Sequence, residues 1–252
     1  MFKNNSKKKL TPAPAFVIVT SHTVTTKQNM RTKTLLIAAA ALVAGIVSSE
    51  AQVYSANVVG YVSLTASNGF SAFNTPLDFD GTGTNNTVTS VIGTNLPVGS
   101  QVLTWNGSGF NVNSYQSVKG APAAWTVPTA TINPGAGYFI SNPSNSPATL
   151  TIVGTVLQGG LTNGNITTAG LSFVGSKFPV AGGITSTYGY TPSLSDQVLS
   201  WNGNGYNVNT YASVKGAPAS WSSGEPQFIV GQGAFVNTTN PHPVWGTNFV
   251  VQ

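Results

Sequence analysis

Short stretches in which apolar and polar side chains alternate dominate the chain after residue 51. The clearest are residues 101–105 and 110–115, two β-rich runs separated by the turn sequence Asn-Gly-Ser-Gly. If these four residues form the loop, the two runs pair as a hairpin whose core-facing side carries Trp105, Leu103, Phe110 and Val112. The opposite side is predicted to be a polar, amide-bearing surface with Val102, Thr104, Asn111 and Asn113.

The hairpin and the loop after it occur twice. Residues 101–125 and 197–221 are identical at 19 of 25 positions, which composition alone does not produce. The second copy repeats the predicted core face with Trp201, Leu199, Tyr206 and Val208. We interpret this as an internal tandem duplication.

No segment after residue 51 has sustained helical periodicity. Further strands are predicted at 58–64, 70–73, 135–140 and 148–153, separated by Gly, Pro and Asn-Gly. The predicted fold class is all-β, with two tandem, small β-sandwich-like or small-barrel domains that arise from the duplication and follow a signal peptide.

The amino-terminal 51 residues have the composition of a leader. Residues 30–51 read as the signal peptide proper, with Arg31 and Lys33 before an apolar run of 13 residues and small residues at Ser49 and Ala51. The run is shorter than the ~20 residues of a membrane-spanning helix, although an uncleaved anchor is the alternative. We expect cleavage after Ala51, a first domain at 52–153 and a second at 154–252.

Three sequence motifs resemble those of a known group of proteins: AQVYSANVVGYV at the expected mature start, WNGxGxNVNxY in both copies, and GAGYF. They are similar to secreted repeat proteins of unknown function predicted in Verrucomicrobia and related bacteria. The resemblance covers residues 52–252. It implies export from a bacterial cell to its envelope or medium, and it supplies no catalytic residue.

Charge is scarce beyond the leader. Seven of the ten Lys and Arg residues precede position 52, whereas residues 52–252 carry three lysines against four acidic residues, a net charge of −1. A nucleic-acid partner would need clustered cations, so we exclude one. The chain has no cysteine and therefore neither disulfides nor thiolate metal sites.

Enzyme chemistry is not expected. The acids are too few and too scattered for a glycosidase pair, and the single histidine after the leader, His242, stands between two prolines. Asp78 and Asp80 form a weak calcium candidate in DFDGTG, because hard oxygens on a tight turn suit that ion. The alternative is a polar loop that happens to hold two acids, and no cofactor is predicted.

Aromatic side chains next to amides recur in both copies. Ring faces stack on sugars and amides bind hydroxyl groups, so these residues are ligand-binding candidates; the alternative is that both tryptophans belong to the core. The candidates are Asn111, Asn113, Tyr115, Lys119, Trp125, Asn207, Asn209, Tyr211, Lys215 and Trp221.

The sequence therefore predicts an exported, non-catalytic structural or cell-surface protein that acts through self-assembly or surface association. The alternative is a carbohydrate-binding or adhesion module that uses the repeated Trp, Tyr and Asn residues. The expected partner is a second copy of the chain or an extracellular polysaccharide, with no membrane span in the mature chain.

Overall fold

The computed structural model describes residues 58–163, 169–240 and 245–251. The expected leader, the expected cleavage site and His242 lie outside these residues. We refer to residues 52–153 as the first half and 154–252 as the second half. The strands of the first half are β1 (Val59–Ala66), β2 (Gly69–Asn74), β3 (Gln101–Trp105), β4 (Phe110–Gln116), β5 (Ala124–Trp125), β6 (Gly137–Asn142) and β7 (Ala148–Thr155).

In the part of the second half that the structure describes there are nine further strands. They are β8 (Gly159–Asn163), β9 (Gly170–Gly175), β10 (Gly182–Gly183), β11 (Gln197–Trp201), β12 (Tyr206–Ala212), β13 (Ser220–Trp221), β14 (Gln227–Phe228), β15 (Gly233–Thr238) and β16 (Trp245–Phe249). The all-β prediction is confirmed. The sequence missed α2 (Val88–Val91), a single helical turn that Thr87 caps by accepting a hydrogen bond from the backbone N–H of Ser90.

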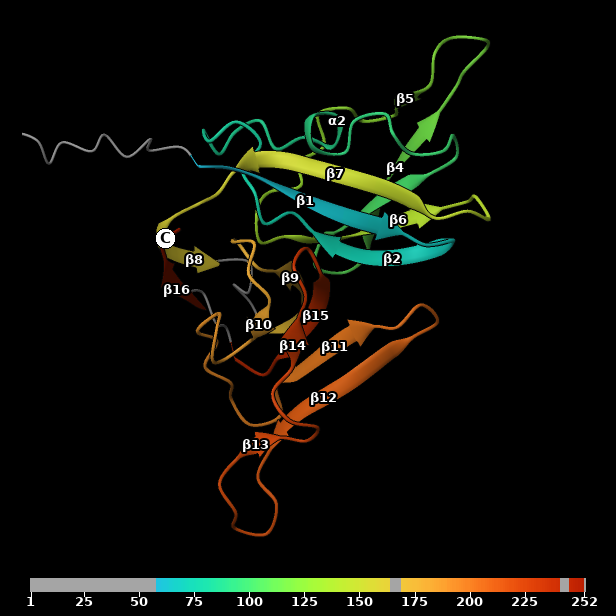
Figure 1. The fold of residues 1–252 in the computed structure, drawn as a ribbon. Coiled ribbons are helices and arrows are strands. Elements are labelled where there is room, and N and C mark those ends of the chain that lie inside the picture. Colours follow the sequence, from blue (N-terminus) through green and yellow to red (C-terminus); the bar gives the residue numbers. More distant parts are fainter. Residues whose placement is uncertain (1–57, 164–168, 241–244, 252) are drawn as a thin grey trace, which may run out of the picture. The chain divides into compact units, whose positions relative to one another are not determined.

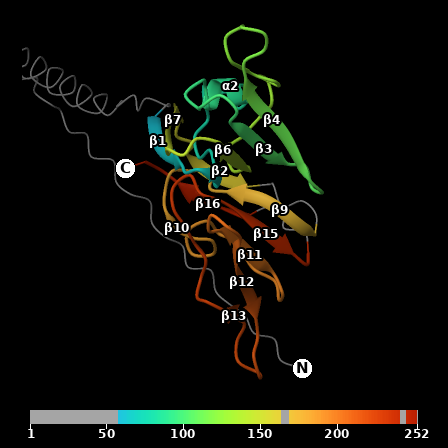
Figure 2. The ribbon, with the colours of Figure 1, turned by 90° about the vertical axis from the view of Figure 1, so that its right-hand side faces the viewer.

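Each half builds one five-stranded antiparallel sheet. The strand order is β2-β6-β3-β4-β5 in the first half and β13-β12-β11-β15-β9 in the second. The predicted hairpin register is confirmed, because Trp105 pairs with Phe110 and Leu103 with Val112. The loops after β4 and β12 extend away from the sheets at opposite ends of the described fold (Figures 1 and 2).

An aromatic layer lies between the two sheets. Phe139 of β6, Phe173 of β9 and Phe235 of β15 form a buried cluster, and the Phe173 and Phe235 rings stack with centroids 4.4 Å apart. Leu103 and Trp105 pack against this cluster from the first half, and Leu199 and Trp201 from the second. The two sheets therefore meet through the apolar faces of the repeated hairpins.

The contacts between the halves are reciprocal. The indole N–H of Trp105 donates to the carbonyl of Leu171 at 3.0 Å, and that of Trp201 donates to the carbonyl of Phe70 at 2.9 Å. Two backbone hydrogen bonds between the halves form a second matching pair. The N–H of Asn74 donates to the carbonyl of Gly231 at 2.7 Å, and the N–H of Gly175 donates to the carbonyl of Gly135 at 3.0 Å. Matching pairs of this kind characterise a twofold, self-complementary interface, formed here within one chain.

Each sheet buries its other face in a core of its own half. In the first half, β1 and β7 cover the sheet, so that Leu64 and Ile152 join Val102 and Ile140 in one buried cluster. In the second half, Tyr190, Phe228 and Trp245 join Val198 and Val236. On the central strands of each sheet, these buried residues alternate with residues of the opposite face, as the pleat requires.

The predicted faces of the hairpin need correction. Val102 and Asn113, expected on an exposed polar surface, are buried at 0% and 5% exposure. On the expected core side, Phe110 and Val112 keep 37% and 50% of their surface, and Trp105 and Leu103 are half-buried. The physical reason is that both faces are covered, one by the core of its own half and the other by the opposite half.

Both halves belong to one compact unit, Ser55–Gln252. The expected domain boundary at residues 153 and 154 falls inside β7, which continues to Thr155. At the contact between the halves, backbone bridges join Phe73 to Gln232 and Ala136 to Val174.

Candidate functional site

The aromatic ligand candidates are mostly interior. Tyr115 and Trp125 are 7% and 5% exposed, and their ring centroids lie 5.2 Å apart across the β4–β5 pair. The second half repeats this arrangement with a half-buried Tyr211 and a buried Trp221. These four rings therefore do not form the exposed sugar-stacking surface that the sequence suggested, and the alternative of a core role fits their burial.

Asn113 and Asn209 anchor the segments after β5 and β13. The Asn113 side chain donates to the carbonyl of Val127 at 2.7 Å and accepts from its N–H at 2.9 Å. Asn209 donates to the carbonyl of Gly224 and accepts from the N–H of Ser223. Both amides are thus used to hold loops in place, which is a structural role.

The remaining ligand-binding candidates are exposed but do not lie together in one site. Asn111 and Asn207 accept hydrogen bonds from Asn106 and Asn202 beside the hairpin turns. Lys119 and Lys215, both at φ 49°, lie in loops beyond the other end of the seven-residue strands β4 and β12. At ~3.4 Å per residue, such a strand separates the lysine from the turn by ~24 Å.

The carboxylates of the DFDGTG loop are occupied by donors of the loop itself. Asp78 accepts from the N–H of Gly83 at 2.8 Å and from the side chain of Asn86 at 2.9 Å. Hydrogen bonds from Asn85 and Thr82 hold the pKa of Asp80 below its usual value. Within the described ranges, no third acidic or histidine ligand joins them, so the arrangement fits a closed polar loop better than a calcium site.

A buried carboxylate that sequence reasoning left without a role lies in the second half. Asp196 is 0% exposed and accepts from the hydroxyl of Tyr190 at 2.6 Å, from the N–H of Ser193 at 2.8 Å and from the N–H of Thr239 at 3.0 Å. In the sequence, the only indication of a special role was that Asp196 takes the place of Ser100 of the first half. These donors make it a link between the 190–196 loop and the end of β15.

No protein-family model, curated protein or solved structure matches this chain. Among the helices that the structure describes, none combines the length and apolar character needed to cross a bilayer.

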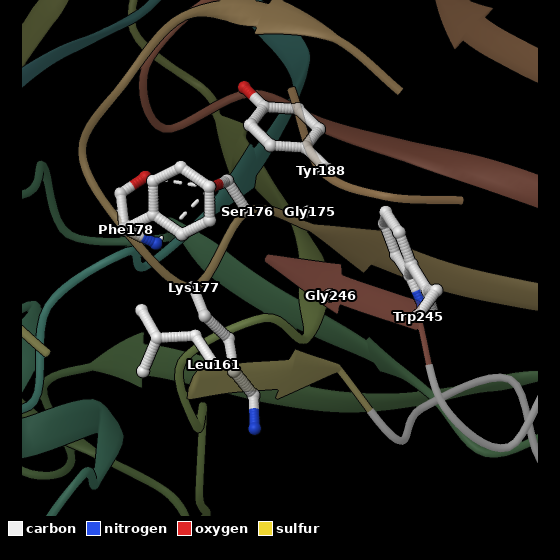
Figure 3. Close-up of a pocket in the computed structure, with 8 residues that line it drawn as sticks. All are labelled: Leu161, Gly175, Ser176, Lys177, Phe178, Tyr188, Trp245 and Gly246. Atoms are coloured by element: carbon white, nitrogen blue, oxygen red, sulfur yellow. Dashed lines mark hydrogen bonds between the residues drawn. The ribbon is translucent and has the colours of Figure 1, made fainter. Parts of the chain in front are cut away.

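One hollow is too small for a ligand. It lies between Phe178, Tyr188 and Trp245, with Lys177 directed past Leu161 and away from the rings (Figure 3). Its volume of about 10 Å³ is about the minimum needed to admit a single water molecule. Burial lowers the pKa of Lys177, but the hollow has no room for a substrate.

Larger hollows lie along the first half. One of about 460 Å³ is lined by Trp105, Asn106, Asn133 and, from the second half, Ser172. A second of about 360 Å³ is lined by Asn111, Val112 and Val127, and the two share Thr104 and Thr131. A third, of about 290 Å³, lies beside Leu64 and Ile229.

An extended exposed face is formed by β1 and β7, which pair over eight residues without a bulge. Their outward side chains alternate with the buried ones and are all uncharged. Val59, Tyr61 and Val153 are 68%, 77% and 51% exposed, and the other outward residues are Ser63, Thr65, Thr149, Thr151 and Thr155. Charged residues or bulges usually guard such exposed strands against association.

The two buried tryptophans of the repeats offer a matched test of these assignments. Trp125 donates its indole N–H to the carbonyl of Gly93 at 2.7 Å, whereas that of Trp221 has no hydrogen-bond partner among the described residues. Trp125→Phe should therefore lower the free energy of unfolding by about 1–3 kcal/mol more than Trp221→Phe, because only the first substitution leaves a carbonyl without its donor. Urea titrations of both variants would measure the difference; equal losses would contradict it.

Buried tyrosines predict a loss of stability at alkaline pH. Burial raises the pKa of Tyr188 to about 12 and raises those of Tyr138 and Tyr190 further. The same side chains ionise near pH 10 when unfolded, so their contribution is complete below about pH 10 and is lost as the pH rises above it. The urea midpoint should be lower at pH 11 than at pH 8, with tyrosinate absorbance rising as the chain unfolds. An unchanged midpoint would show that these hydroxyls are not buried.

Proposed function

We propose that the chain is an exported, non-catalytic structural protein that associates with further copies of itself through the exposed face of β1 and β7. The observation that carries this proposal is the uncharged ladder of eight residue pairs with Val59, Tyr61 and Val153 exposed. Export rests on the leader-like residues 30–51 and on the resemblance of the repeat motifs to secreted proteins.

The chemistry of this face favours contact with a like surface. Tyr61 and Val153 are directly paired across the two strands and form an apolar patch, flanked by the Ser63–Thr151 and Thr65–Thr149 pairs. Hydroxyl groups both donate and accept, so a second copy of the same face is complementary to it. Such contact is isologous and closes on itself as a dimer; edge-to-edge pairing of the strands would extend it.

The strength of the contact follows from its size. Eight residues at ~3.4 Å and two strands ~5 Å apart give a face of roughly 27 by 10 Å. This is well below the ~800 Å² per partner of a stable complex, so we expect a weak, transient association. With a net charge of −1 over residues 52–252, there is little repulsion to oppose association and little salt dependence.

The test is to place a charge on this face. In the chain that begins at Gln52, Tyr61→Lys should raise the concentration needed for association by tenfold or more, because two lysines would meet where the faces touch. Light scattering over a concentration series at low and high salt would measure it. Val214→Lys is the matched control, since Val214 is 67% exposed in the loop after β12. A wild-type chain that stays monomeric at high concentration, or equal effects of both substitutions, would contradict the proposal.

A further inference from the structure

The two larger hollows of the first half adjoin, and we refer to them together as the groove. They share Thr104 of β3 and Thr131 of the segment before β6, and they continue from Asn111 on the hairpin to Ser172 on β9. Their volumes of about 460 and 360 Å³ each fall in the range of small-molecule sites. The combined space is therefore sufficient for a small organic ligand.

The larger hollow of the groove lies where the two halves pack together. Trp105 and Asn133 come from the first half, and Leu171, Ser172 and Phe173 from the second. The indole N–H of Trp105 donates to the carbonyl of Leu171 and thereby fixes the ring at the junction. The position of the groove is thus set by the same contact that joins the sheets.

Its lining has the chemistry of a neutral polyol site. The hydroxyl-bearing residues Thr104, Thr131 and Ser172 and the amide-bearing Asn133 are among its lining residues, and no residue that lines either hollow is charged. Amides and hydroxyls both donate and accept hydrogen bonds, as sugar hydroxyls require. The half-buried ring of Trp105 adds an aromatic surface for the apolar side of a sugar.

The second half does not repeat this lining. Residues 96 positions further along the chain place Gln227 where the groove has Thr131, Ile229 where it has Asn133, and Gln232 where it has Ala136. The hollow beside Ile229 is smaller, about 290 Å³, and is bordered by Leu64 and Val230. The position of the second half that is equivalent to Asn133 is thus occupied by an apolar residue, Ile229.

We propose that this groove binds a neutral oligosaccharide segment of an extracellular polysaccharide. The site goes beyond the proposed self-association and uses residues away from β1 and β7. It also differs from the aromatic surface suggested by the sequence, because Trp105 and Asn133 take the place of the buried Tyr115 and Trp125.

The proposal is tested by introducing the residue of the second half into the groove. Asn133 is an exposed residue, so Asn133→Ile should leave the unfolding midpoint unchanged while it removes a hydrogen-bonding amide and adds an apolar branch. Ile229→Asn, the reverse change at the equivalent position, is the matched control, since Ile229 is 70% exposed. Both variants are made in the chain from Gln52 to Gln252, which contains the whole compact unit.

The probes are β-linked hexasaccharides of glucose, mannose and xylose, with hexagalacturonate as the anionic comparison. Calorimetric titration should detect binding of at least one neutral hexasaccharide and none of hexagalacturonate. Asn133→Ile should weaken that binding by tenfold or more, while Ile229→Asn and Tyr61→Lys leave it within twofold. Binding unaffected by Asn133→Ile, tighter binding of the anionic probe, or no binding of any neutral probe would overturn the proposal.

Discussion

Replacing Phe235 by alanine should lower the free energy of unfolding by about 3–5 kcal/mol, one of the largest effects of a single substitution in this chain. Phe235 is 4% exposed, and its ring stacks on Phe173 and lies 5.2 Å from Trp105 of the other half. Alanine would leave a cavity in the aromatic layer that neither sheet can fill alone. Urea unfolding followed by tryptophan fluorescence would measure the loss.

Phe79→Ala is the matched control for this substitution. Phe79 is 41% exposed in the loop after β2, so its removal should cost less than about 1 kcal/mol. If both substitutions had the same effect, the aromatic layer would not be a packed interior, and the account of how the halves meet would be wrong.

Gly233→Ala should be the second severe change, with a loss of about 1–3 kcal/mol or more. A methyl group at this position would meet the backbone oxygen of Phe73 and approach the ring of Phe173 to 3.2 Å. Because a backbone oxygen cannot rotate away as a flexible side chain can, the start of β15 would have to move away from the first half. Thermal unfolding of the variant would measure the cost.

The control for Gly233 is Gly205 in the turn of the second hairpin. An added methyl group at Gly205 has no neighbour within 4 Å, and the residue does not have a positive φ. Gly205→Ala should therefore leave the unfolding temperature almost unchanged. A similar loss for both variants would show that the cost at Gly233 does not come from the contact between the halves.

The local structure of the repeats was predictable because it depends on adjacent residues. The turn Asn-Gly-Ser-Gly and the alternation around it determine that Trp105 pairs with Phe110. The alternation does not determine which layer each face contacts, and here Val102 and Trp105 both pack inward, on opposite sides of the same sheet. Period-2 patterns distinguish the two faces of a strand but not what covers them.

The candidate sites were harder to predict for the same reason. Trp125 and Asn113 have residue types typical of sugar binding, yet their burial depends on packing that their own segment does not encode. Asn133 and Ser172 come together in one groove only because the halves associate. One signal in the sequence points to that association: Leu103 and Trp105 recur unchanged as Leu199 and Trp201, as a self-complementary contact requires.

The claim that the two halves form a single structural unit is tested most directly by differential scanning calorimetry of the chain from Gln52 to Gln252. The reciprocal hydrogen bonds of Trp105 and Trp201 and the shared aromatic layer predict one cooperative transition, with equal calorimetric and van't Hoff enthalpies. Two separate transitions, or a calorimetric enthalpy about twice the van't Hoff value, would contradict this claim and indicate halves that unfold independently.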